Sequence, residues 1–528
     1  MKVNIFRSLT SLVPKHFHGT QLWTLIPQEY KVSALLGVTE IDPKLIDAES
    51  VEKIKFCFSE YPDIREEIFP RLRKVRSNVS NPLNSSFLSC ILSSLSIKDR
   101  DLSWTEWLRK NTENVVKDIS KLISRWKTSG IVLSDSDCLL AEWLMWILST
   151  TNRTLRDNAT KALYEFGRHR PNKLFELTLK SSTINDPYIF ERMLATSYGV
   201  SLDIVGGELN ESKYHGMLTW LVNNLFKNFY LQPISYSTHF IIRKAVNDII
   251  LVANKILPVK ERIKVPPSKL LPQIKWGSIN WDRKLNHPFH MDFENYTIGR
   301  LIPDRANYNY DHPEYKHVKE QMLWRVLDLG WSDNDFGKVD SQISSGQHHH
   351  RISSSNDKID RYGKKYSWIA YDEIAGVLID QGKLEADWDC ASSEIDFSFP
   401  VLAEHQDMIT DEILELDVES DSDWLTRQVP EVINKQLINV DSTCKVLLDG
   451  LIEKEVHSSK RKIFVFVRGY FIKNAELSDF IDQFKDSEFS SSLLPEKPDL
   501  RNTSLKEYVL KEQDESDFVS HIDFEIGS

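Results

Sequence analysis

Two short blocks of the sequence carry the residues best suited to chemistry, and both are cationic. One block places Arg361, Lys364 and Lys365 around a Gly-Lys-Lys run at the start of an expected helix. Lysines at a helix N-terminus oppose the helix dipole, so a negative partner must compensate for them. We expect this partner to be the stretch 404–423, which has nine acidic residues and no lysine or arginine. An external anion is the alternative.

The second group of cationic residues is Arg300, Arg305 and Arg325, which lie in or next to aromatic-rich segments. Guanidinium groups form bidentate hydrogen bonds with carboxylates, and Asp304, Asp311 and Asp328 lie nearby in the sequence. We expect internal ion pairs that clamp a domain, with ligand binding as the alternative. The candidate binding residues of both blocks are Arg300, Asp304, Arg305, Arg325, Arg361, Lys364 and Lys365.

Motifs of familiar catalytic centres are absent from the sequence. The Gly-Lys-Lys run lacks the upstream glycine and the metal-binding hydroxyl of a P-loop, and no Gly-x-Ser-x-Gly run exists. A metal-dependent nuclease could use Asp449 with Glu453 and Lys454, but this lysine directly follows the acid instead of standing two positions after it. We therefore predict no catalytic residues and no cofactor, and we keep a nuclease or other phosphodiester-cleaving enzyme with a C-terminal acidic site as the alternative.

Histidines and cysteines give little indication of a metal site. Adjacent loop histidines such as His348–His350 bind a transition ion weakly unless the fold supplies a further ligand. We expect them to lie in a solvated loop over 341–356. We expect His287 and His290 to pack with neighbouring aromatic residues. The five cysteines are far apart and form no Cys-x-x-Cys pair, which predicts neither zinc nor disulfides.

Composition restricts the class of protein further. The chain has 528 residues, is 41% hydrophobic and carries a formal net charge of −11. This length is too great for one hydrophobic core, so we expect roughly three packed units. The net acidity argues against nucleic acid as a partner. The sequence shows no signal peptide, and its longest apolar run, Cys138–Leu148, is too short to span a bilayer, so we expect a cytoplasmic protein without a membrane partner.

Helix signals follow one another through the first half of the chain. Asn152 precedes an apolar pattern with helical spacing, and the run Asn185-Asp-Pro187 combines a capping side chain with proline at the first helical position. Short helices joined by tight turns are typical of HEAT-like repeats, and we expect Pro258 to stop the last of them. Near the C-terminus, 446–456 and 463–472 have the pattern of two strands joined by a polar turn.

The predicted fold class is mainly α, an irregular HEAT-like α-solenoid, followed by an α+β C-terminal domain. We expect an N-terminal helical region over 1–130, HEAT-like helical repeats over 131–258, a proline-rich linker over 259–275, an aromatic-rich and mostly helical domain over 276–400, and the α+β domain with a loose tail over 401–528.

Several long strings of this sequence resemble the region downstream of the ATPase in large bacterial antiviral STAND proteins of the AVAST anti-phage type. The resemblance covers residues from about 139 to 451. The strings that carry it are Asn152–Leu163, Asp186–Arg192, Tyr296–Arg305, His312–Tyr315, Arg361–Tyr366 and Ile395–Pro400.

The resemblance implies a function in recognition. In that family an effector and a P-loop ATPase precede helical repeats that recognise a viral protein. This chain resembles the repeats and tail alone, so no catalytic residue and no ATP-driven activation carry over. We expect a non-catalytic, sensor-like module of a bacterial defence system that binds a viral protein, a separate ATPase subunit or both. A structural scaffold is the third hypothesis, after the sensor-like module and the phosphodiester-cleaving enzyme.

Overall fold

The computed structural model describes most of the first 384 residues and four short strands. The described residues are 36–128, 130–206, 212–231, 237–266, 276–279, 287–289, 293–302, 312–350, 359–384, 444–447, 449–456, 461–468 and 507–510, with single positions 27, 30, 209 and 478. The chain divides into two compact units, 1–351 with 355–395 and 352–354 with 396–528.

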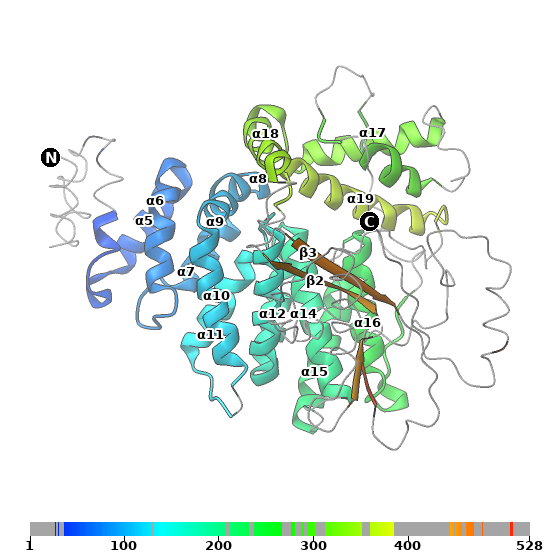
Figure 1. Ribbon diagram of the computed structural model, residues 1–528. Coiled ribbons are helices and arrows are strands. Elements are labelled where there is room, and N and C mark those ends of the chain that lie inside the picture. The colour runs from blue at the N-terminus through cyan, green and yellow to red at the C-terminus, as the bar shows by residue number, and fades with distance from the viewer. Residues whose placement is uncertain are drawn as a thin grey trace, which may run out of the picture. The chain divides into compact units, whose positions relative to one another are not determined.

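The first unit is mainly helical, as the sequence predicts (Figure 1). Its α-helices are α5 (Ala48–Glu60), α6 (Asp63–Val75), α7 (Ser85–Ser93), α8 (Ile97–Arg100), α9 (Glu106–Lys110), α10 (Thr112–Trp126), α11 (Asp135–Ile147), α12 (Arg153–His169), α13 (Pro171–Ser181), α14 (Pro187–Gly206), α15 (Ser212–Phe226), α16 (Phe240–Ala253), α17 (Pro313–Asp328), α18 (Asp333–His350) and α19 (Tyr362–Asp380). Short 3-10 or π-helical turns are η1 (Pro43–Leu45), η2 (Asp101–Thr105), η3 (Lys227–Leu231), η4 (Val259–Glu261), η6 (Phe293–Thr297) and η7 (Ile298–Leu301).

The helices from α7 to α16 stack in two rows. In one row α10, α12, α14 and α16 pack side by side, and in the other α7, α11, α13 and α15 do the same. Packing of α11 on α12, α13 on α14, and α15 on α16 joins the rows. This is the layered packing of helix pairs that the sequence pattern indicates.

The predicted helix starts are confirmed at α12 and α14. Asn152 Oδ1 accepts a hydrogen bond from the Leu155 amide at 3.1 Å, and Asp186 Oδ1 accepts one from the Tyr188 amide at 3.2 Å. These side chains satisfy amides that have no partner within the helix. Gly330 follows α17 with a φ of 103°, which a glycine adopts at little cost.

Helix α19 lies across the N-terminal ends of α12, α14 and α16 (Figure 1). Ile359, just before it, forms a β-bridge with Asn152 at the start of α12. Further along, Lys365 contacts Asp186 at the start of α14, and Gly376 meets the backbone of Thr238 before α16. Helices α17 and α18 pack on α19 and complete one apolar core with it.

Two sequence predictions need correction. The expected loop over 341–356 is wrong for 341–350, which continue α18. Ser332 and Asp335 form a capping pair at the start of this helix, and Phe336, Val339 and Ile343 supply apolar residues at helical spacing. The polar composition after Ile343 obscured that pattern. In addition, α16 ends at Ala253, five residues before the proline expected to stop it.

Backbone pairing in the second unit is described for four strands. Strands β2 (Asp449–Val456) and β3 (Arg461–Arg468) form an antiparallel hairpin, with Val456 opposite Arg461. Strand β1 (Cys444–Leu447) pairs antiparallel with β4 (Glu507–Leu510). An α+β domain around these pairs stays a prediction, as do the finer domain boundaries. Among the described residues, no helix is both long enough and apolar enough to cross a membrane.

Candidate functional site

The basic cluster that the sequence singles out lies at the start of α19. A residue of another helix, α18, caps the N-terminus of α19. The Arg361 side chain makes no capping hydrogen bond. The carboxylate of Asp340, on α18, accepts hydrogen bonds from the amides of Tyr362 and Gly363 at 2.6 and 2.9 Å. Burial raises the pKa of Asp340, whereas these two amides stabilise its ionised form. A carboxylate thus lies where the helix dipole favours negative charge.

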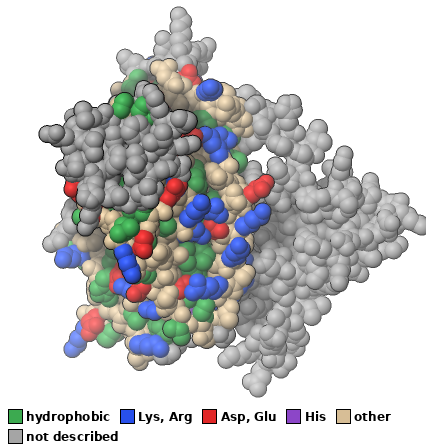
Figure 2. All heavy atoms as spheres, turned by 90° about the vertical axis from the view of Figure 1, so that its left-hand side faces the viewer, with side chains coloured by type: hydrophobic (Ala, Val, Ile, Leu, Met, Phe, Trp, Pro, Cys, Tyr) green, Lys and Arg blue, Asp and Glu red, His purple; other side chains and the backbone are tan. Residues whose placement is uncertain are grey.

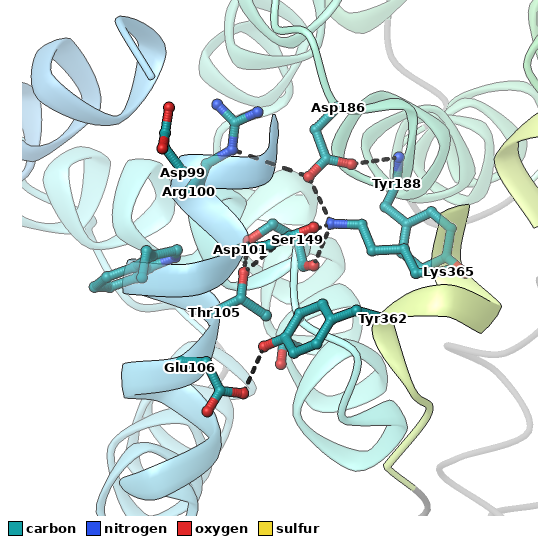
Figure 3. A network of polar contacts seen from close by, with 12 residues as sticks. Asp99, Arg100, Asp101, Thr105, Glu106, Ser149, Asp186, Tyr188, Tyr362 and Lys365 are labelled. Carbon is teal, nitrogen blue, oxygen red and sulfur yellow. Dashed lines mark hydrogen bonds and ion pairs between the residues drawn. The ribbon is translucent and has the colours of Figure 1, made fainter. Parts of the chain in front are cut away.

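Lys365 is fully buried, and internal acceptors use all of its donors (Figure 3). Its Nζ donates to Asp101 Oδ1 at 2.8 Å, to Asp186 Oδ2 at 2.9 Å and to the Ser149 carbonyl at 3.0 Å. An ammonium group has three protons, so its hydrogen-bonding capacity is filled. We call Arg100, Asp101, Ser149, Asp186 and Lys365 the Lys365 network.

Charges within the Lys365 network balance. Arg100 is also fully buried; it donates to the Leu92 carbonyl at 2.9 Å, and its Nε lies 4.0 Å from Asp186 Oδ2. Two cations therefore face the carboxylates of Asp101 and Asp186. Burial raises the pKa of Asp101 to about 6, although Lys365 opposes this shift. Because buried charges are costly when unpaired, each member depends on the others.

Tyr362 extends the buried polar contacts toward α9. Its hydroxyl donates to Glu106 Oε1 at 2.8 Å (Figure 3). The guanidinium of Arg109 holds the same carboxylate through two bonds of 2.8 Å. Burial and the neighbouring Glu106 raise the pKa of Tyr362 well above its usual value, so the hydroxyl stays a donor.

Salt bridges continue along the rest of α19. Arg243, on α16, donates to both oxygens of Asp380 at 2.7 and 3.1 Å. Arg325, on α17, binds Glu373 in a bidentate pair at 2.6 and 3.0 Å. Bidentate pairs of this kind fix orientation as well as distance. They hold α19 against both α16 and α17.

A glycine permits a close approach between α19 and the segment just before α16. A Cβ atom on Gly376 would lie 1.8 Å from the carbonyl oxygen of Thr238. The Arg243 guanidinium also donates to the Gly376 carbonyl, at 3.2 Å. Only a residue without a side chain fits this position while the two backbones remain in contact.

The predicted site residues have different surroundings. Lys365 is buried, so an exposed role in binding an external anion does not match its contacts; Lys364 pairs with Asp360 at 2.8 Å. Arg325 binds Asp328 at 2.5 Å, as expected, besides its bidentate partner. Arg300 is exposed in η7 and does not join the cluster at the start of α19. Asp304, Arg305 and the acidic stretch 404–423 lie outside the described residues.

Few local signals in the sequence point to the acidic partners. Asp101 stands in the run Lys98-Asp-Arg-Asp101, whose charge is typical of a solvated surface, and yet Asp101 is fully buried. Asp186 carries only the signal of a helix cap. The usable signal is the Gly-Lys-Lys run itself, because two lysines at a helix start require nearby anions.

The geometry of the Lys365 network is that of buried ion pairs that join separate helices. A catalytic lysine needs a free position for a substrate or a proton, whereas the donors of Lys365 are all engaged. Within the described parts of the chain, no group of three or more His, Cys, Asp or Glu side chains could hold a metal ion. The side chains of His348–His350 and of the β2 acids lie outside that description.

Comparison with known proteins gives no relative: no family model, curated protein or solved structure matches this chain.

Proposed function

We propose that this chain is a non-catalytic, sensor-like protein-recognition module of a bacterial anti-phage defence system, built on a HEAT-like α-solenoid. One observation carries the proposal: α19 contacts the starts of α12, α14 and α16 and so connects neighbouring helices of the stacked rows. Stacked helix pairs present extended surfaces to macromolecules. A fixed spacing between the pairs keeps such a surface in one shape, which lowers the entropic cost of binding.

The charges support a role in positioning. Lys365 links η2, the end of α11 and the start of α14, which are far apart in the sequence. The charged residues of the Lys365 network join these segments. Their replacement should therefore loosen the surface of the helix rows and should not abolish a reaction. The assignment to anti-phage defence rests on the resemblance to AVAST-type STAND proteins, and it makes a viral protein or a separate ATPase subunit the expected partner.

Surface character favours protein over nucleic acid as the partner. Figure 2 shows one end of the molecule, on which Lys and Arg side chains lie among acidic and apolar ones. Duplex binding needs a continuous basic surface that neutralises several phosphates. The formal net charge of −11 points the same way.

The nuclease alternative has weaker support. Its acid and lysine, Glu453 and Lys454, are consecutive residues of β2. Consecutive residues of a strand alternate between its faces, so a strand does not direct such a pair toward one metal ion.

Affinity purification of the tagged chain from infected and uninfected cells tests the proposal. We expect a phage protein or an ATPase subunit to be enriched only with the folded chain, and cross-links from it to map to the helix rows. Divalent-metal-dependent cleavage of nucleic acid by the purified chain, lost in Asp449→Asn and Glu453→Gln, would overturn the proposal in favour of the enzyme.

A further inference from the structure

One histidine is buried where α14, α16 and α19 meet. His239 directly precedes α16 and is fully buried. Carboxylate oxygens of Glu191, on α14, and Asp372, on α19, lie 3.6 and 3.7 Å from its Nε2. Both separations are longer than a hydrogen bond, and neither ring nitrogen has a hydrogen-bond partner among the described residues. We call His239 and the helix surfaces around it the His239 junction.

The His239 junction leaves almost no room for water. The carbonyl of Thr238, the preceding residue, lies so close to Gly376 of α19 that a Cβ atom would not fit between them. Next to the two carboxylates is a cavity of about 20 Å³, which has room for a single water molecule. A charge added at His239 therefore cannot be hydrated as it would be in open solvent.

The charged groups of the junction offer little compensation for an added cation. These groups are Arg156, Glu191, Arg192, Arg243, Asp372 and Asp380. Arg243 and Asp380 bind each other at 2.7 Å. The guanidinium groups of Arg156 and Arg192 are buried and line the small cavity together with Glu191 and Asp372. Two cations thus already lie near the two carboxylates that face His239.

Protonation of His239 is therefore costly in the closed junction. A neutral imidazole has one N–H donor, whereas an imidazolium has two. Neither donor would have an acceptor at hydrogen-bond distance among the described residues. Attraction between buried charges outweighs their desolvation only when the geometry is good and hydrogen bonds form. Burial accordingly lowers the pKa of His239 to about 3, although the two carboxylates oppose this shift.

Opening of the junction removes this cost, because an exposed imidazole has a pKa of about 6.5. A histidine whose pKa is lower in the closed state favours closure fully above pH 6.5, and this contribution is lost as the pH falls toward 3. Between pH 7.5 and 5.0, the ratio of open to closed junction should therefore rise about 30-fold.

We propose that His239 is a pH-sensitive switch: the neutral imidazole permits α19 to close on α14 and α16, and uptake of a proton opens this junction. The inference goes beyond the proposed function and does not depend on it, because an open junction would loosen the helix rows whatever they bind.

Hydrogen–deuterium exchange at pH 7.5 and 5.0, corrected for the intrinsic pH dependence of amide exchange, tests the switch on the full chain. In the wild type, the protection of α19 and of the second turns of α14 and α16 should fall about 30-fold relative to that of α6, which lies outside the junction. His239→Gln keeps a polar side chain that takes up no proton, so this relative fall should be less than about threefold. His317→Gln replaces an exposed histidine of α17 and is the matched control, which should behave as the wild type does.

The protonation state of His239 in the wild type gives an independent test. Histidine ¹⁵N NMR should show a neutral His239 imidazole in the folded chain at pH 5.0, and this measurement holds even if His239→Gln does not fold. A protonated His239 at pH 5.0, an equal fall of protection in His239→Gln, or a fall shared equally by α6 would each overturn the switch. Neither measurement uses a binding partner, so failure of partner capture from infected cells would remove the proposed function and leave the switch.

Discussion

Replacement of Lys365 by methionine removes one buried charge while keeping most of the side-chain volume. The change leaves Asp101 and Asp186 facing Arg100 alone, so one negative charge is buried without compensation. The Ser149 carbonyl loses its donor as well. Methionine is flexible and apolar, so it fills the space without restoring a hydrogen bond.

The magnitude follows from the distances. Two unit charges 2.9 Å apart attract by about 6 kcal/mol at an effective dielectric constant of about 20, before the cost of desolvation is counted. Breaking a buried pair by removing one partner lowers stability by about 3 to 5 kcal/mol. We expect Lys365→Met to lower the free energy of unfolding of the helical unit by about this amount.

Urea unfolding followed by tryptophan fluorescence measures the effect. Lys117→Met is the matched control, because Lys117 is exposed on α10, and its removal should change stability by less than about 0.5 kcal/mol. The double variant Lys365→Met with Asp186→Asn leaves one cation and one carboxylate in the network and should recover part of the loss. If Lys365→Met unfolds within about 1 kcal/mol of the wild type, the Lys365 network does not hold α19 in place.

Three other variants test separate contacts. Gly376→Ala places a methyl group against the Thr238 carbonyl and should lower the melting temperature, at a cost of about 1 to 3 kcal/mol. In contrast, a Cβ at Gly216 would meet no atom within 4 Å beyond its chain neighbours and its own helix backbone, so Gly216→Ala should stabilise α15 by about 0.5 to 1 kcal/mol. Tyr362→Phe removes one of the three hydrogen bonds to the Glu106 carboxylate, leaves the two from Arg109, and should reduce the urea-derived free energy of unfolding by about 1 to 3 kcal/mol. Burial lowers the pKa of His239 to about 3, below its unfolded value of about 6.5, although the carboxylates of Glu191 and Asp372, 3.6 and 3.7 Å from its Nε2, oppose this shift. The contribution of this group is therefore complete above pH 6.5 and falls toward pH 3. His239→Gln should therefore remove an acid-side slope of up to about 1.4 kcal/mol per pH unit, measured as urea midpoints between pH 6 and 4.

Local signals in the sequence predicted the helices well. Asn152 and the Asn-Asp-Pro run before α14 specify helix starts through short-range hydrogen bonds, and these bonds do not depend on the rest of the fold. The end of α18 was missed because its serines and histidines have weak helix propensity, whereas packing of Phe336 and Ile343 decides the outcome.

The partners of the basic cluster lay beyond the reach of a single sequence. Lys365 meets Asp101 and Asp186 across sequence separations of 264 and 179 residues. No periodicity or spacing relates residues so far apart, and only the three-dimensional packing of α19 across the helix starts brings them together. The need for a negative partner could be predicted from elementary electrostatics, but its identity could not.

Hydrogen–deuterium exchange tests most directly whether α19 and the helix rows form one cooperative unit. We predict that the hydrogen-bonded amides of α19 and those in the second turns of α12, α14 and α16 exchange with similar protection in the wild type, and that Lys365→Met lowers the protection of all four together. Rapid exchange of α19 in the wild type, or a loss of protection in the variant confined to α19, would contradict the account.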